Sequence, residues 1–158
     1  MTEPSEINIG LTTSEREQVA MGLKHLLADT YTLYLKTHHH HWNVTGPRFR
    51  DLHLLFEEQY NELAIAVDDI AERIRTLGFA APGTYREFHE LTRLEEHSGE
   101  LDADGMLADL VVAQEATVTG ARKLLPLTQD AGDESSASLI ADRLVVHEKA
   151  AWMLRSMR

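Results

Sequence analysis

Four side chains that can bind a metal ion recur at helical spacing between residues 51 and 77. His53 and Glu57 are four residues apart, and so are Asp68 and Glu72. At about 100° per residue, with His53 as zero, the four lie at about 0°, 40°, 60° and 100°, on one stripe beside an apolar face. A mixed imidazole and carboxylate set suits Fe, Mn or Zn. The segment therefore predicts a metal-binding helix.

The ordinary alternative is a solvated acidic face. Acidic residues at this spacing often support nearby arginines through ion pairs, and Arg73 and Arg75 lie in the same segment. Confinement of four ligand-type side chains to one narrow stripe favours the metal interpretation without excluding the ion pairs.

One chain cannot bring both pairs to one ion. Glu57 and Asp68 are separated by roughly 16 Å along a helix that rises 1.5 Å per residue, whereas metal–ligand bonds are only about 2.0–2.6 Å long. Residues 57 and 68 share their midpoint with residues 53 and 72, so a two-fold axis there would place each pair opposite the other pair of a second copy. Ala64, small and close to that axis, would allow the two helices to approach. We predict two identical metal sites across a dimer interface.

The elements that must position these residues are helices. A capping box of Ser14 and Glu17 predicts the start of a first helix that runs to the histidines at 38–41. The turn Gly46-Pro47 then leads into a second helix from about Phe49 to Leu77, which Gly78 ends.

The second half of the chain predicts a second pair of helices. The connection over residues 79–100 is long enough to hold a short helix. A third helix begins near Leu101 and is ended or kinked by Pro126, and a fourth covers about Glu134 to Arg155. We expect an all-α protein: a ferritin-like four-helix bundle over residues 14–158, with a short extra helix between helices two and three and an N-terminal tail over 1–13.

The composition and charge of the chain favour some classes of function over others. The 158-residue chain has no cysteine and a formal net charge of −11, and the start MTEPSEINIG shows no secretory signal. The acidic balance argues against phosphate-backbone binding and favours attraction of cations. A cytoplasmic location is expected, with nucleoid association left open.

Three motifs together resemble the Dps family, the mini-ferritins of bacteria and archaea. They are HWNVTGPRF, LHLLFEE and VDDIAERIRTLG, which lie within residues 41–78. The resemblance implies a cage of twelve subunits whose di-iron centres oxidise Fe(II), preferentially with hydrogen peroxide, and store ferric oxide, so protecting DNA and cell from oxidative damage. By position it implies that one subunit supplies His41, His53 and Glu57 and that its neighbour supplies Asp68 and Glu72. Zn or Mn are the expected substitutes for Fe.

Two departures qualify the resemblance. The family more often has Asp at the place of Glu57, which puts occupancy of the second iron position in doubt. Many Dps proteins bind DNA through a lysine-rich tail that this chain lacks, so weak or absent DNA binding is expected.

A nucleoid protein with little ferroxidase activity and a non-catalytic divalent-metal binding protein remain the alternatives. An intrasubunit centre is disfavoured because the chain has no Glu-x-x-His motif.

The remaining histidines and both tryptophans receive structural roles. Within the run at 38–41, neighbouring side chains diverge by about 100°, so all four imidazoles cannot meet at one ion. His41 is singled out as the ligand. His38 is assigned to the surface or to packing, with a transient iron site as the alternative, and His39 and His40 are interpreted as bystanders.

Trp42 is assigned to packing at the helix end, with electron donation as the alternative, and Trp152 is assigned to the core. The other side chains considered are surface or core histidines and candidates for an acidic ion path: His89, His97, His147, Asp130 and Asp133.

Overall fold

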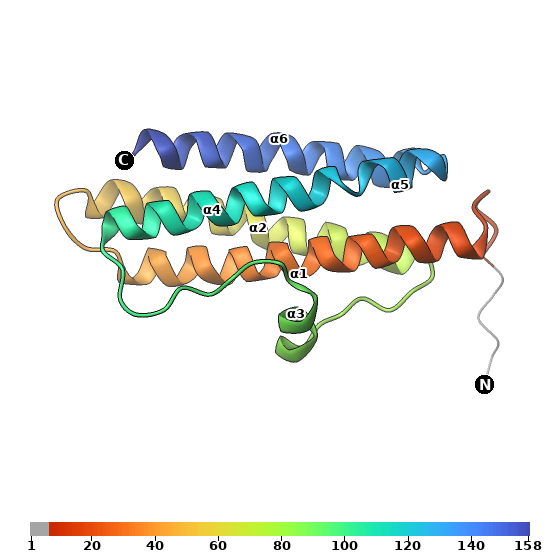
Figure 1. The fold of residues 1–158 in the computed structure, drawn as a ribbon, viewed down its shortest axis with the longest axis horizontal. Coiled ribbons are helices and arrows are strands. Elements are labelled where there is room, and N and C mark those ends of the chain that lie inside the picture. Colours follow the sequence, from red (N-terminus) through yellow and green to blue (C-terminus); the bar gives the residue numbers. More distant parts are fainter. Residues whose placement is uncertain (1–6) are drawn as a thin grey trace.

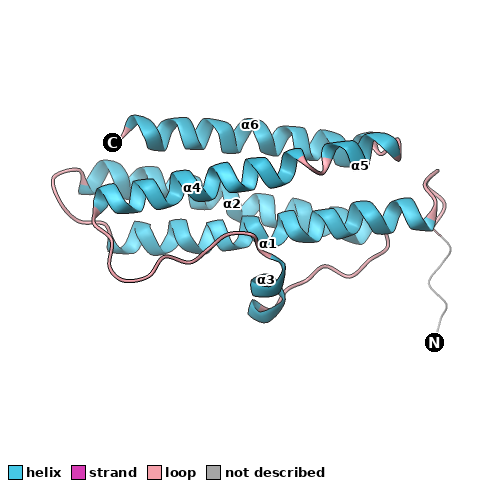
Figure 2. Ribbon diagram, in the orientation of Figure 1, coloured by secondary structure: helices cyan, strands magenta, loops and turns pink. Residues whose placement is uncertain are grey.

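A computed structural model describes residues 7–158, and every regular element in that range is a helix (Figures 1 and 2). The helices are α1 (Thr13–Asn43), α2 (Phe49–Thr76), α3 (Tyr85–Leu91), α4 (Ala103–Arg122), α5 (Leu125–Asp130) and α6 (Glu134–Ser156). The all-α bundle with a short extra helix in the middle connection is thereby confirmed. Of the tail expected over 1–13, residues 1–6 lie outside the described residues, and residues 7–12 form no helix.

The long helices form two antiparallel pairs (Figure 1). α1 packs on α2 and α4 packs on α6, while the connection between the pairs runs along the outside of the bundle and carries α3. Two clusters of buried apolar side chains, one toward each end of α1, fill the space between the helices. None of the helices in the described range is long and apolar enough to cross a membrane.

The ends of α1 and α2 follow from local hydrogen bonds. The capping box at the start of α1 consists of Thr12 and Glu15, so the expected pair Ser14 and Glu17 is wrong by two residues. Gly78 follows α2 with φ of 96°, the left-handed conformation that glycine adopts without a Cβ clash.

A buried carboxylate fixes the connection between α3 and α4. Asp29 of α1 is fully buried and accepts hydrogen bonds from the Thr92 hydroxyl at 2.9 Å and from the Arg93 backbone N–H at 2.7 Å. The Arg93 guanidinium also pairs with Asp29 and lies against Gly120 of α4, where a Cβ would come within 2.4 Å of its Cζ atom. This connection is therefore held closely against the bundle.

The turn before α6 depends on Asp133. Its carboxylate accepts from the backbone N–H of Ser136 at 3.0 Å, which caps α6, and from the Arg73 guanidinium of α2 at 2.7 Å. Burial alone would raise the pKa of Asp133, but the bonds from Ser136 and Arg73 outweigh it and hold that pKa below 3.8. Asp133 is only 3% exposed, so its assignment to an acidic ion path was wrong, whereas Asp130 is exposed. Pro126 lies in the first turn of α5, after α4 has ended at Arg122.

We predict that Asp133→Ala lowers the free energy of unfolding by about 2–4 kcal/mol, because it removes a helix cap and leaves the Arg73 charge without its partner. Asp130→Ala, the matched control on the exposed turn, should change it by less than about 0.5 kcal/mol. Urea unfolding at one fixed protein concentration measures both. The loss of unfolding free energy caused by Asp133→Ala should have its full size above about pH 4 and should shrink as pH falls below it. The reason is that the pKa of Asp133 is lower in the folded chain than in the unfolded chain. Equal effects of the two substitutions would contradict this role.

Candidate functional site

His41 and His53 form a reciprocal pair where α1 and α2 meet. The Nδ1 atom of His41 lies 2.7 Å from the backbone oxygen of His53, and the Nδ1 atom of His53 lies 2.8 Å from the backbone oxygen of His41. The two rings stack with centroids 3.7 Å apart and planes 16° apart. The structure therefore brings together the two histidines that the sequence analysis assigned to one subunit.

These hydrogen bonds decide the tautomer of each ring. A carbonyl oxygen can only accept, so Nδ1 must carry the hydrogen in both histidines. In the neutral ring, Nε2 then keeps its lone pair, which is the form that binds a metal ion. Backbone carbonyls that hold the other nitrogen are the usual means of orienting a metal-binding histidine. Both imidazoles thus have the tautomer that a metal ligand requires.

Aromatic side chains surround this pair. The ring of Tyr60 lies 5.0 Å from His41 and 4.3 Å from His38, and His38 in turn lies 3.9 Å from Trp42. Burial and the neighbouring Glu57 carboxylate raise the pKa of Tyr60, which keeps its phenol protonated. His38 is a packing residue, as expected, and burial followed by the nearby His41 lowers its pKa. Trp42 packs on His38 with one side and is otherwise exposed.

The carboxylates of the stripe divide as the spacing predicts. Glu57 follows His53 by one helical turn and is partly buried, whereas Asp68 and Glu72 are exposed about three to four turns further along α2. Within residues 7–158 neither Asp68 nor Glu72 forms an ion pair, because Arg73 binds Asp133 and Arg75 binds the Phe79 carbonyl. The interpretation of this acidic face as support for the arginines is therefore wrong.

The interior of the bundle holds a set of polar side chains that are hydrogen-bonded to one another. His147 is buried; its Nδ1 atom lies 2.7 Å from the Gln114 amide oxygen, and the Arg143 guanidinium lies 3.2 Å from its Nε2 atom. Arg143 also pairs with Glu62. A guanidinium at the free nitrogen of the histidine opposes metal binding there. His147 is thus the hydrogen-bonded core histidine that the sequence analysis expected.

A model of the ferritin-like domain matches residues 21–158 of the chain. DNA protection during starvation protein 2 of Bacillus anthracis is 35% identical over 140 residues, which cover 89% of this chain and 96% of the relative. The chain belongs to the Dps family. A low temperature-induced protein of Nostoc sp. (strain PCC 7120) is 43% identical over 95% of this chain and 85% of its own length.

Solved structures agree with this assignment to the Dps family. The Dps protein of Vibrio cholerae O1, described as a member of a broad superfamily of ferritin-like diiron-carboxylate proteins, superposes with a TM-score of 0.91 at 30% identity and 99% coverage of both chains. The resemblance first drawn from the motifs within residues 41–78 is confirmed. Dps membership connects the chain to iron, and His41 and His53 are the two residues of the predicted iron site that the single subunit brings into contact.

Sequence reasoning missed one group of three residues. His40, assigned as a bystander, is fully buried, and its Nε2 atom lies 2.7 Å from Asp109 of α4. His97, assigned to the surface or core, lies next to both. Asp109 was the available signal, because a single acid in the apolar run MLADLVVA must be buried with a partner. Trp152 is also misassigned, since it is 59% exposed on α6 rather than in the core.

We predict that the buried His147 makes stability depend on pH. Burial first, and the Arg143 charge second, lower its pKa from 6.5 to about 3. The unfolded chain takes up this proton near pH 6.5 and the folded chain does not, so stability should fall by up to about 1.4 kcal/mol per pH unit as pH drops from 6.5 toward 3.

The variant His147→Gln provides the comparison, because glutamine keeps a polar side chain that does not titrate. Urea unfolding at several pH values between about 7 and 4 should show a shallower loss of stability in the variant than in the wild type. Parallel curves for the two proteins would show that His147 contributes nothing to the pH dependence.

Proposed function

We propose that this Dps protein is a ferroxidase that oxidises Fe(II) at di-iron sites shared between subunits and stores the ferric product inside a dodecameric cage. The observation that carries the proposal is the reciprocal bonding of His41 and His53, which leaves both Nε2 atoms as ligands beside Glu57. In this proposal the substrate Fe(II) is held by these three residues and by Asp68 and Glu72 of a neighbouring subunit. The superfamily named for the Vibrio cholerae relative supports the same chemistry.

The surface of α2 supports a two-fold interface. Ala64 is exposed close to the axis at residue 62.5, and the apolar side chain of Ile65 beside it is 67% exposed in the single chain. An apolar residue of this size, next to a small one at the centre of a helix, suits close contact with a second copy. The exposed Asp68 and Glu72 would then be covered by the partner subunit's α2, at the end of that helix that carries His53.

Hydrogen peroxide is the proposed oxidant. Two Fe(II) ions each give one electron to one peroxide molecule, whose O–O bond breaks to give two water molecules once two protons are added. Oxidation of iron in pairs avoids the one-electron reaction that releases a hydroxyl radical. The longer side chain of Glu57 keeps the carboxylate of the site but displaces it by about one methylene, so we expect weaker binding of the second iron ion.

Asp68→Asn should slow peroxide-dependent iron oxidation by about ten- to a hundredfold, because it removes one anionic ligand while keeping the side chain's shape. Asp69→Asn, the neighbouring exposed acid on another face of α2, is the matched control and should leave the rate unchanged. Fe(II) is added anaerobically, then peroxide at one per two irons, and ferric absorbance is followed together with particle mass.

The double variant His41→Ala, Glu72→Ala should assemble but oxidise slowly. If that double variant oxidised iron at the normal rate, these residues would not be the site.

Subunit mixing tests the division of the ligands between chains. In a dimer of one His53→Ala and one Glu72→Ala subunit, one site loses both residues and the other keeps every ligand. Random mixing makes about half of the dimers mixed, so about one quarter of all sites should be intact. Subunits unfolded and refolded together should regain activity that neither variant has alone, and refolding each variant separately is the control. No recovery, with mixed dimers shown by mass, would exclude sharing between subunits.

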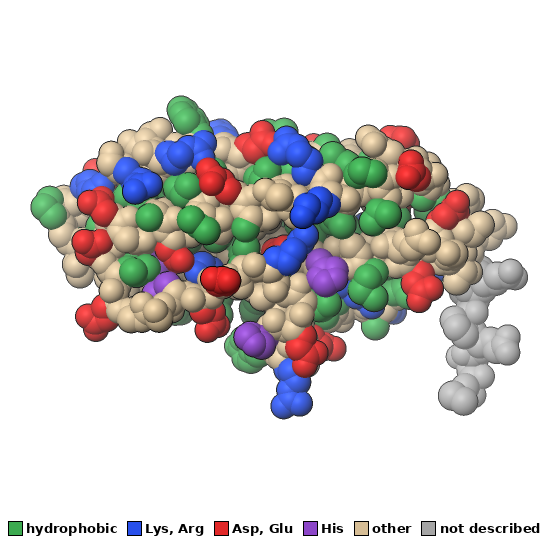
Figure 3. All heavy atoms as spheres, viewed as in Figure 1, with side chains coloured by type: hydrophobic (Ala, Val, Ile, Leu, Met, Phe, Trp, Pro, Cys, Tyr) green, Lys and Arg blue, Asp and Glu red, His purple; other side chains and the backbone are tan. Residues whose placement is uncertain are grey.

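A second function, structural binding of DNA, is not supported by charge. Lys and Arg side chains are interspersed with Asp and Glu over the face shown in Figure 3, and the net charge is −11. Protection of DNA, named for the Bacillus anthracis relative, would then come from removal of iron and peroxide in the cytoplasm. A non-catalytic metal-binding protein would keep the ligands but show no peroxide-dependent oxidation.

We predict that excess protein leaves the gel mobility of plasmid DNA unchanged at physiological salt, because the chain offers too few clustered cations to release counterions. The same gel at low salt serves as the sensitive comparison. A low-mobility complex at physiological salt would contradict the proposal and favour a nucleoid protein.

A further inference from the structure

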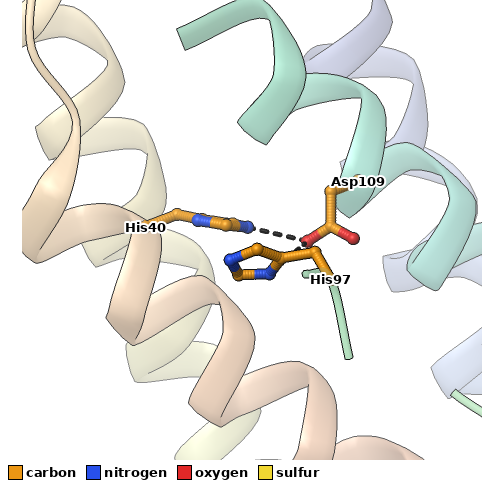
Figure 4. A group of neighbouring side chains, drawn as sticks. All are labelled: His40, His97 and Asp109. Carbon is orange, nitrogen blue, oxygen red and sulfur yellow. Dashed lines mark hydrogen bonds and ion pairs between the residues drawn. The ribbon is translucent and has the colours of Figure 1, made fainter. Parts of the chain in front are cut away.

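His40, His97 and Asp109 meet outside the proposed ferroxidase site. Figure 4 shows the imidazole of His40 from α1 directed at the Asp109 carboxylate of α4, and the imidazole of His97, from the connection before α4, alongside the His40 ring. The ligand atoms of the three residues all lie within 4.8 Å of one another, and no other such group of three occurs in the range 7–158. We propose that these residues form a second, intrasubunit site for a divalent transition-metal ion, with Zn(II) as the reference ion.

The distances suit an ion after a small adjustment. Asp109 Oδ2 lies 2.7 Å from His40 Nε2 and 3.7 Å from His97 Nδ1. Tetrahedral ligands with bonds of about 2.0–2.1 Å lie about 3.3 Å apart, a value between these two distances. One imidazole therefore has to move outward and the other inward by roughly half an ångström. His97 is on a connection outside the helices and can make the inward part of this movement.

His40 is placed as a ligand rather than as a surface side chain. It is fully buried, and its Nδ1 atom has no hydrogen-bond partner among the described residues. Its tautomer is thus set only by what lies at Nε2, where the Asp109 oxygen now accepts a hydrogen. A metal ion there would take the place of that hydrogen between the same two atoms. Metal binding at Nε2 would leave the ring hydrogen on Nδ1, and no described residue donates a hydrogen bond to that nitrogen that would prevent this.

The surrounding charges select the class of ion. The Lys36 ammonium lies 3.0 Å from the other Asp109 oxygen, Oδ1, and also donates to the Glu95 carbonyl at 2.9 Å. Asp109 and Lys36 together carry no net charge, so Ca(II) or Mg(II), which need several anionic oxygens, are disfavoured. Two imidazoles and one carboxylate oxygen instead suit Zn(II), Co(II) or Fe(II).

The framework is fixed and open to solvent. Asp29 and Lys36 hold the connection on either side of Leu94, so His97 starts from a tethered backbone. Asp109 and His97 border a surface hollow of about 440 Å³, and His39 and His97 border a second of about 360 Å³. An ion can enter by either hollow, and water can complete its coordination.

Zn(II) binding to the assembled protein tests the site, in a background that carries His53→Ala, Asp68→Ala and Glu72→Ala. That background removes ligands from both halves of the proposed ferroxidase centre, so the result does not depend on whether the ferroxidase proposal is correct. Equilibrium dialysis with metal analysis should find about one Zn(II) per subunit, and Co(II) should give a visible absorption spectrum of mixed nitrogen and oxygen ligation.

Two further variants in the same background identify the ligands. His97→Ala should weaken Zn(II) binding by tenfold or more, and Asp109→Asn should do the same while keeping the shape of the side chain. His89→Ala, which removes an exposed histidine of α3, is the matched control and should leave the affinity unchanged. Helix content from circular dichroism verifies that each variant is folded. Absence of Zn(II) binding in the background, or equal affinity in the His97 and His89 variants, would overturn the proposal.

Discussion

The rotation of about 100° between neighbouring residues of an α-helix governs the chemistry of this protein, because four histidines occupy consecutive positions at the end of α1. The four imidazoles therefore point in different directions. His41 faces α2 and pairs with His53, His40 reaches Asp109 on α4, His39 lies beside His97, and His38 packs on Tyr60. One short run of identical residues thus serves several separate environments, and the helix prevents them from forming a single cluster.

The length of α2 imposes a second constraint. Its two ligand pairs are too far apart for one ion, and the structure shows no fold-back that would bring them together within the subunit. Half of the proposed iron site is rigidly prepared by the histidine pair, and the other half is an exposed acidic patch at Asp68 and Glu72. Assembly of subunits and completion of the site would therefore be the same event.

The sequence was sufficient for features that depend on local chemistry. The helix periodicity, Gly78 and the motifs within 41–78 led to the bundle, its extra helix and the Dps family, and the structure and the comparisons confirm all three. The spacing of His41 and His53 identified a pair that the structure does bring into contact. The completed site with Glu57, Asp68 and Glu72 stays a prediction, because it requires a second subunit.

The errors concern side chains whose environment is set by distant residues. Asp133 looked like an exposed turn acid, yet its role depends on Arg73, 60 residues earlier. His40 looked like a bystander because its partner Asp109 is 69 residues away on another helix. Trp152 was assigned to the core, although it lies on the outward face of α6 and is 59% exposed. The capping box was placed two residues late because Thr12 and Ser14 offer the same local pattern.

The hydrogen-bonded polar side chains inside the bundle limit which substitutions the protein tolerates there. Glu62, Arg143, His147 and Gln114 occupy the space between α2, α4 and α6 as one hydrogen-bonded set. Replacing His147 alone would leave the buried Gln114 without its hydrogen-bond partner, so a first step toward an internal iron centre costs stability. Coordinated substitution of several of these residues would be needed. The polar set inside the bundle therefore opposes an iron centre there, in keeping with the proposed site between subunits.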